Sequence, residues 1–213
     1  MKIDSYKIWY ALFFLIVNIV FLSMGSVYGA EQIARENGII ENLQAFLIFS
    51  AFATFAWIAY WQDGPPQTSA VLLASMCFVV FFREVDFHFM RAPLRISSLL
   101  SARDVSLLII LGLLSLFVAR RRSDMPAMLK QLLQPSALLL IAVVALVATG
   151  ELIEDWGSKQ PLALLLEEML ELNAYALLLV TAVHFPDMTG AARPRKLQAR
   201  RRVRPSARLR DPA

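Results

Sequence analysis

The chain alternates between long apolar runs and short polar segments. Apolar residues dominate six stretches, 8–24, 39–61, 70–90, 105–119, 135–153 and 162–185. A helix needs about 20 predominantly apolar residues to cross the hydrocarbon core of a bilayer. The pattern therefore predicts an all-α fold, a polytopic membrane bundle of six transmembrane helices within residues 1–190, followed by a basic tail over residues 191–213 that is predicted to be disordered.

The polar segments predict where these helices begin and end. Connections are expected at residues 25–38, 62–69 and 154–160, a short interfacial helix at 123–134, and a helix stop at Pro186. The first run is interpreted as an uncleaved span, because its 17 residues exceed the usual core of a signal peptide and more membrane segments follow. The alternative is a cleaved signal, for which Val27-Tyr28-Gly29 offers small residues at the two expected positions.

Composition narrows the class of protein. The chain is 58% hydrophobic, with a mean hydropathy of +0.56, which is more apolar than an ordinary soluble domain. Cys77 is the single cysteine, so an intrachain disulfide and a cysteine zinc cluster are both excluded. The net charge of +4 comes from the tail, where Arg193 to Arg210 contains nine Lys or Arg and no acid. A basic segment beside membrane spans fits anionic lipid headgroups, and no nucleic-acid partner is expected.

Charge bias predicts the orientation of the spans. With six spans, both termini lie on one side, which would receive fifteen of the 21 Lys and Arg residues, including Arg120-Arg121-Arg122. The excess of Lys and Arg marks the cytoplasmic side, so both termini are expected in the cytoplasm. The segment from Arg91 to Arg103 runs against this bias, since it would place basic residues outside.

Acidic residues gather on the opposite side. Eleven of the 17 acids fall in the outer loops or outer halves of the spans: Glu31, Glu36, Glu41, Glu84, Asp86, Glu151, Glu154, Asp155, Glu167, Glu168 and Glu171. From Pro161, Glu167 lies about 9 Å and Glu171 about 15 Å along a helix of 1.5 Å rise. Charges at such depth rarely face lipid. The sequence therefore predicts a polar cavity that opens to the outer face.

The spacing of these acids indicates a metal-binding or acid–base site. Glu84 and His88 are four residues apart, and Glu168 and Glu171 are three apart, so each pair shares a helix face. Carboxylates and an imidazole from several helices can hold a divalent metal ion of the hard or borderline class. We expect a membrane enzyme acting on a lipid or lipid-linked substrate. Its predicted catalytic residues are Glu84, His88 and Arg83, its metal ligands are Glu41, Glu84, His88, Glu168 and Glu171, and Gln44 would assist positioning.

Other interpretations of the same residues stay open. Arg83 can neutralise a glutamate of another span, which would make the cluster a structural ion-pair network. Glu41 in a first helical turn is favoured by the helix dipole without any ligand. A proton- or cation-coupled transporter would also use intramembrane carboxylates. A non-catalytic membrane scaffold or accessory subunit would need them only for assembly.

Two stretches resemble a group of small, uncharacterised multi-pass proteins of the bacterial inner membrane: residues 36–44 (ENGIIENLQ) and 83–88 (REVDFH). The resemblance implies that membrane as the location and implies no activity. A fainter similarity connects Glu41, Ser50 and His88 to the alkaline-ceramidase-like membrane hydrolases. The late His-x-x-x-His of those enzymes has no counterpart here, so the similarity does not carry over their catalytic zinc.

Overall fold

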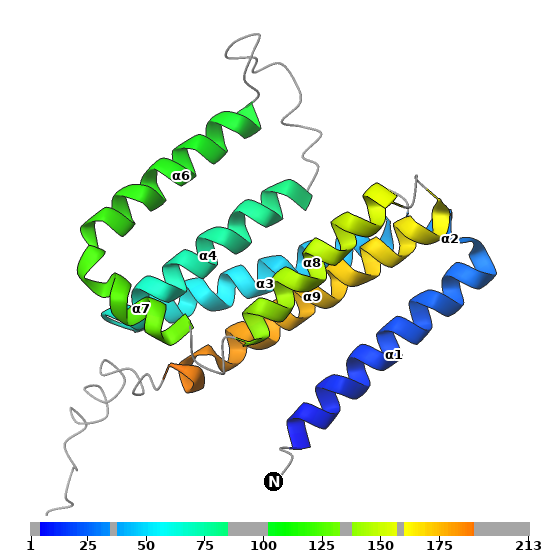
Figure 1. Ribbon diagram of the computed structural model, residues 1–213, viewed down its shortest axis with the longest axis horizontal. Coiled ribbons are helices and arrows are strands. Elements are labelled where there is room, and N and C mark those ends of the chain that lie inside the picture. Colours follow the sequence, from blue (N-terminus) through cyan, green and yellow to red (C-terminus); the bar gives the residue numbers. More distant parts are fainter. Residues whose placement is uncertain (1–4, 35–37, 85–101, 133–137, 157–159, 190–213) are drawn as a thin grey trace, which may run out of the picture.

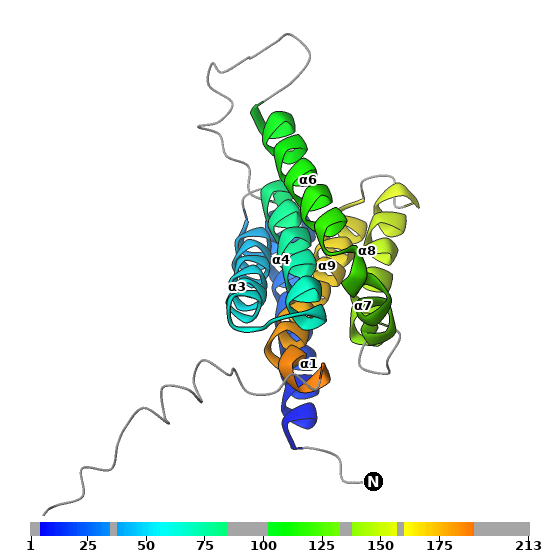
Figure 2. The ribbon, with the colours of Figure 1, turned by 90° about the vertical axis from the view of Figure 1, so that its left-hand side faces the viewer.

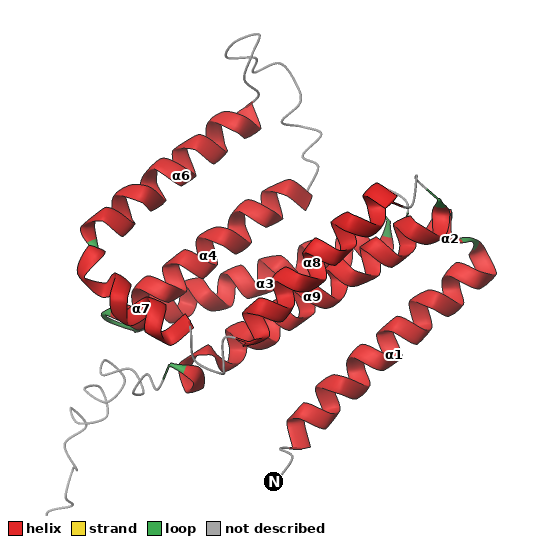
Figure 3. Cartoon of the chain, in the orientation of Figure 1, coloured by secondary structure: helices red, strands yellow, loops and turns green. Residues whose placement is uncertain are grey.

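The computed structural model describes residues 5–34, 38–84, 102–132, 138–156 and 160–189, and within these ranges the chain is helical apart from short connections (Figure 3). The elements are α1 (Ser5–Tyr28), α2 (Ala30–Ile33), α3 (Ile39–Trp61), α4 (Pro65–Glu84), α6 (Ala102–Arg120), the 3-10 turn η1 (Arg122–Asp124), α7 (Met125–Leu132), α8 (Leu138–Trp156) and α9 (Pro161–Met188). The predicted all-α class is confirmed for this part of the chain.

The long helices run roughly along a common direction, as two perpendicular views show (Figures 1 and 2). Helix α3 packs mainly against α4 and α9, and α8 packs mainly against α9, whereas α1 and α6 have fewer neighbours and lie at the edges. Three helices are long and apolar enough to cross a membrane, over Tyr10–Tyr28, Ile39–Trp61 and Pro65–Phe82. Leu108–Arg120 and Leu138–Ile153 form shorter apolar helices. The chain is thus a helical membrane protein by length and composition, while the six predicted spans stay a prediction.

Large apolar side chains cover the outside of the bundle. Ile16 on α1 is 58% exposed, Phe46 on α3 63% and Leu113 on α6 63%. Contiguous apolar surface of this kind is unfavourable in water and is normal against lipid. Trp57 and Tyr60, both well exposed, lie at the end of α3, where aromatic residues are typical of the membrane interface.

The core lies between α3, α4 and α9 and is rich in small residues. Ala51, Ala70, Ala174 and Ala182 are fully buried, which allows the helix backbones to approach closely. Phe55 of α3 fills the space between them and meets the Phe185 ring edge to face, with centroids 5.6 Å apart. These contacts hold the second half of α3 against the second half of α9.

Several predicted boundaries were wrong at helix ends, and the short helix α2 (Ala30–Ile33) lies inside the segment 25–38 that was expected to be a connection. Helix α4 begins at Pro65, although residues 65–69 were assigned to a loop. Proline lacks only a backbone donor that the first turn does not use, so it is tolerated there. Helix α9 continues past Pro186 to Met188, because a proline this close to a helix end disturbs only the final turn. Residues 154–156 belong to α8, and residues 25–28 to α1, where polar connections were expected.

A polar network fixes the end of the bundle where α4 begins and α6 ends, which we call the basic end. Thr68 is fully buried and its hydroxyl donates to Oδ2 of Asp124 at 3.0 Å. Nη2 of Arg121 donates to Oε1 of Gln67 at 3.1 Å, and its Nη1 lies 3.6 Å from Asp124. The arginines that follow α6 are thereby held beside the start of α4. The opposite end, where α3 and α9 begin and α8 ends, is called the acidic end.

Candidate polar site between helices α3, α8 and α9

The site starts from a glutamine that lies wholly inside the bundle. Gln44 of α3 has no exposed surface, and its Nε2 donates to the carboxylate oxygen Oε2 of Glu168 at 2.8 Å. The same nitrogen donates to the backbone carbonyl of Glu168 at 2.9 Å. Two acceptors on one residue of α9 therefore fix the depth at which α3 and α9 meet.

Glu171 lies one turn further into the bundle and is only 6% exposed. It faces α8 at Gly150, where an added Cβ would lie 3.8 Å from Cγ of Glu171 and 3.7 Å from Cγ of Glu167. The backbone of α8 at Gly150 thus lies close to two glutamates that are four residues apart on α9. We refer to Gln44, Gly150, Glu167, Glu168 and Glu171 together as the Gln44–Glu168 site.

One buried hydrogen-bond acceptor of this site is left over. Oε1 of Gln44 is buried and has no hydrogen-bond partner among the described residues. A buried acceptor without a partner costs about 1–3 kcal/mol. Because Oε1 and Nε2 belong to one amide, the oxygen lies beside the Glu168 carboxylate. A bound cation or a ligand donor would satisfy it.

A second polar contact lies next to the site and is closed on itself. Asn18 of α1 and Asn173 of α9 exchange two hydrogen bonds, each 2.9 Å from Nδ2 to Oδ1. Each Nδ2 also donates to the carbonyl four residues earlier, that of Phe14 or of Met169. Both amides use their donors and their side-chain oxygens within this contact, so it joins α1 to α9.

Three of the predicted site residues lie toward the acidic end of the bundle. Glu168 and Glu171 share the Gln44–Glu168 site, and Glu41 is half-buried in the first turn of α3, one turn before Gln44. Glu151 of α8 is exposed and lies five residues before the end of that helix.

The remaining predicted residues belong to the end of α4 and the segment after it. Arg83 and Glu84 are the last residues of α4, but the structure does not describe their side chains, and His88 lies outside the described residues. The described ranges contain no group of three or more His, Cys, Asp and Glu side chains placed to hold a metal ion. Since α3 and α4 run antiparallel, α4 ends at the acidic end, where α3 starts (Figure 1).

The polar cavity predicted at the outer face stays a prediction. Glu171 and Gln44 are packed among helices, while Glu167 and Glu168 are half-buried nearer the acidic end. The backbone of α8 at Gly150 lies close to Glu167 and Glu171.

Gly150 and the Asn18–Asn173 contact were not predicted as parts of a site. Small residues commonly mark close helix contacts in membranes, so a lone glycine before Glu151 was an available signal. Asn18 and Asn173 are polar residues within apolar runs, and such residues usually find a partner in another helix. His184 lies near the end of α9, far from the site, with Nδ1 3.9 Å from Oδ2 of Asp187.

The donor set determines what the site can bind. Carboxylate and amide oxygens accept hydrogen bonds and coordinate hard cations, and they repel anions. A group of such oxygens inside an apolar bundle therefore suits a proton, a metal ion or a cationic group. Comparisons of the chain with protein-family models, curated proteins and solved structures gave no match.

Proposed function

We propose that this chain is a multi-pass membrane enzyme that binds a divalent cation at its acidic end and acts on a lipid or lipid-linked substrate. The observation that supports the proposal best is the amide of Gln44, which is fully buried and bonded to Glu168, and whose Oε1 has no partner within the described part of the chain. Intramembrane carboxylates are costly, and they usually serve a function when they persist. A cation would satisfy Oε1 of Gln44 and offset the charge of the neighbouring carboxylates.

The proposed ligands come from two regions. Glu168 and Glu171 would contribute from α9 and Glu41 from the start of α3. Glu84 and His88 would complete the set from the end of α4 and the segment after it. The antiparallel arrangement of α3 and α4 favours this, because it directs the end of α4 to the acidic end (Figure 1). His88 would serve either as a ligand or, in place of that, as general base, and Arg83, outside the ligand set, would orient an anionic substrate group.

Metal analysis of the purified protein tests the proposal. We expect about one divalent ion per chain after purification in detergent with Mg²⁺, Mn²⁺ or Zn²⁺ supplied in turn. Glu168→Gln and Glu171→Gln should lose the ion, and the exposed Glu151→Gln should keep it. Size-exclusion chromatography would show that each variant is folded. An ion-free wild-type protein, or equal ion content in all variants, would refute the cation site. Incubation with a total membrane lipid extract, followed by mass spectrometry, would then identify the converted lipid.

A scaffold or accessory subunit is the second candidate function. It is supported by the Asn18–Asn173 contact, which only joins helices, and by the Gln44–Glu168 bond, which can do the same. In that case Glu171→Gln would impair folding or assembly without changing ion content. Transport is less well supported, because Asn173 is engaged with α1 and Thr181 donates to the carbonyl of Leu177. These two groups are not aligned as a polar route inward from Glu171.

We also propose that the protein lies in the bacterial inner membrane with the basic end and both termini in the cytoplasm. Residues with exposed side chains allow a paired test in a Cys77→Ala background, with Gln32→Cys at the acidic end and Ser123→Cys at the basic end. A membrane-impermeant maleimide should label Gln32→Cys in intact spheroplasts and Ser123→Cys only after permeabilisation. The reverse pattern would invert the orientation.

A further inference from the structure

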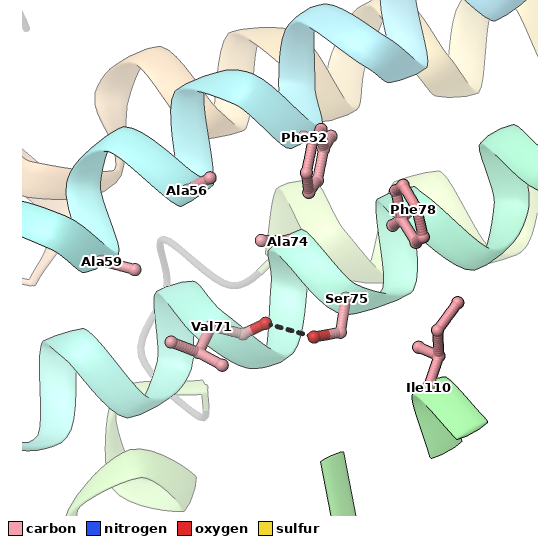
Figure 4. Close-up of a pocket in the computed structure, with 8 residues that line it drawn as sticks. All are labelled: Phe52, Ala56, Ala59, Val71, Ala74, Ser75, Phe78 and Ile110. Atoms are coloured by element: carbon pink, nitrogen blue, oxygen red, sulfur yellow. Dashed lines mark hydrogen bonds between the residues drawn. The ribbon is translucent and has the colours of Figure 1, made fainter. Parts of the chain in front are cut away.

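An apolar groove of about 380 Å³ lies between α3, α4 and α6, away from the acidic site (Figure 4). It is lined by Phe52, Ala56, Ala59, Val71, Ala74, Ser75, Phe78 and Ile110. Its volume is within the range of about 300–1,000 Å³ that is usual for ligand pockets. Small side chains leave the hollow, because alanines take positions on both α3 and α4 where larger residues would fill it.

The shape of the groove is set by residue size along the two helices. Phe52 and Phe78 pack with ring centroids 5.2 Å apart at the side nearer the acidic end. From there the lining extends over eight residues of each helix, to Ala59 and Val71, which is about 10 Å along the helix axes. The groove is therefore elongated, and its alanine-lined part leads toward the basic end.

The side chains that line the groove offer too few hydrogen-bonding groups to hold water. Ser75 contributes the single hydroxyl among the lining side chains, and that hydroxyl donates to the carbonyl of Val71 at 2.9 Å within its own helix. A water molecule needs two to four polar partners to stay in a cavity. An empty groove would lose dispersion contacts along its walls. Since the groove belongs to helices that can cross a membrane, the occupant with matching chemistry is a hydrocarbon chain.

The inner end of the groove is connected to positive charge. Ala59 lines the groove, and its carbonyl accepts a hydrogen bond from Nε2 of Gln67 at 3.1 Å. Oε1 of the same Gln67 accepts from Arg121 at 3.1 Å. Arg120 and Arg122 flank Arg121 and are exposed, while Asp124 supplies one nearby negative charge. Basic residues beside a cleft between membrane helices are typical of binding sites for anionic headgroups.

We infer that this groove and the arginines at its end form a site for an anionic phospholipid, with an acyl chain in the groove and the phosphate beside Arg120–Arg122. This phospholipid would belong to the bilayer leaflet at the basic end of the bundle. The inference depends on the membrane location of the chain and not on the proposed cation site. Lipid tails are as apolar as the lining, so shape and headgroup charge, and not hydrophobic transfer, would favour this lipid over the surrounding bilayer.

The test uses phosphatidylglycerol with a diazirine on its acyl chain, in nanodiscs that also contain phosphatidylcholine. Photolysis and peptide mapping should place adducts on the groove residues of α3 and α4. Ser75→Phe would fill the groove and should reduce these adducts roughly tenfold. Its control is Met76→Phe, because the neighbouring Met76 points outward and is 59% exposed. That variant should keep the adducts.

A second arm tests the headgroup. Diazirine-labelled phosphatidylglycerol should give roughly fivefold more adducts in the groove than labelled phosphatidylcholine, and Arg120→Gln with Arg122→Gln should remove this preference. Equal adducts in the wild type, Ser75→Phe and Met76→Phe would overturn the acyl site. Equal labelling by both lipids would overturn the headgroup assignment. The divalent ion content of Ser75→Phe, measured in parallel, should equal that of the wild type, so failure of one proposal is distinguishable from failure of the other.

Discussion

Replacing Gln44 is the most direct test of the Gln44–Glu168 site, but the single substitution alone is a poor measure. Gln44→Met conserves volume and removes both hydrogen bonds that Nε2 donates to Glu168. It also removes Oε1, which has no partner among the residues that the structure describes and whose burial therefore costs about 1–3 kcal/mol. The loss of the two hydrogen bonds lowers stability and the removal of the buried oxygen raises it, so the net change in unfolding free energy is expected to be small.

A double-mutant cycle of Gln44→Met with Glu168→Met isolates the side-chain contact, because the bond to the backbone carbonyl is retained in Glu168→Met. Hydrogen bonds between membrane helices average about 0.6 kcal/mol in such cycles and reach about 1.7. A bond to an ionised group is roughly twice as strong as a neutral one. The 2.8 Å bond to the carboxylate should therefore show a coupling energy of about 1.2 kcal/mol.

Unfolding by SDS from mixed micelles, followed by tryptophan fluorescence, gives the four free energies of the cycle. A control cycle of Gln44→Met with Glu151→Met should show coupling within about 0.3–0.5 kcal/mol of zero, because Glu151 is exposed on another helix. If the Gln44–Glu168 cycle gave no more coupling than this control, the two side chains would not be in contact and the site would lose its central bond.

Three further predictions concern other contacts in the bundle. At Gly150 an added Cβ makes only ordinary contacts at 3.6–3.8 Å, so Gly150→Ala should raise the stability measured by SDS unfolding by up to about 1 kcal/mol. Gly150→Leu should lower it by about 1–3 kcal/mol, because the larger side chain would separate α8 from α9. Equal stability of the two variants would contradict that packing. Asn18→Val and Asn173→Val should show a coupling of about 0.6–1.7 kcal/mol in the same assay, and additivity would mean that α1 is not joined to α9 there. Thr68→Val should lower stability by about 1 kcal/mol, because it removes the hydroxyl that donates to Asp124. The control is Thr54→Val, which should be near neutral because the Thr54 hydroxyl bonds only within α3. Equal effects of the two variants would refute the Thr68–Asp124 contact.

Helix α3 shows how far hydrophobic pattern alone can define an element. Its predicted range, 39–61, matches Ile39–Trp61, because Gly38 precedes the run and polar residues come directly after it. The prediction was less accurate where proline was interpreted as a breaker. Pro65 starts α4 and Pro186 lies inside α9, since proline disturbs a helix mainly in its interior turns.

The partners of the intramembrane polar residues could not be predicted in the same way. The pattern identified Gln44, Glu168 and Glu171 as unusual, because a polar group in an apolar run has few possible hydrogen-bond partners in a membrane. Gln44 and Glu168 are separated by 124 positions in sequence, and Asn18 and Asn173 by 155. Which polar residue meets which depends on how whole helices pack. The sequence therefore supplied the candidates, and the packing of α9 against three neighbours determined the pairs.

The directions of the polar side chains on α9 follow from helix geometry, and they explain why this helix organises the site. At about 100° per residue, Glu167 and Glu171 are about 40° apart, whereas Asn173 is about 140° from Glu168. The observed partners match these directions: α8 beside Glu167 and Glu171, α3 at Glu168 and α1 at Asn173. A rotation of α9 by one residue would break all three contacts together. The glutamates are consequently held at a fixed depth and direction by two amide contacts and by the packing of α8 at Gly150, and the proposed cation site would need this preorganisation.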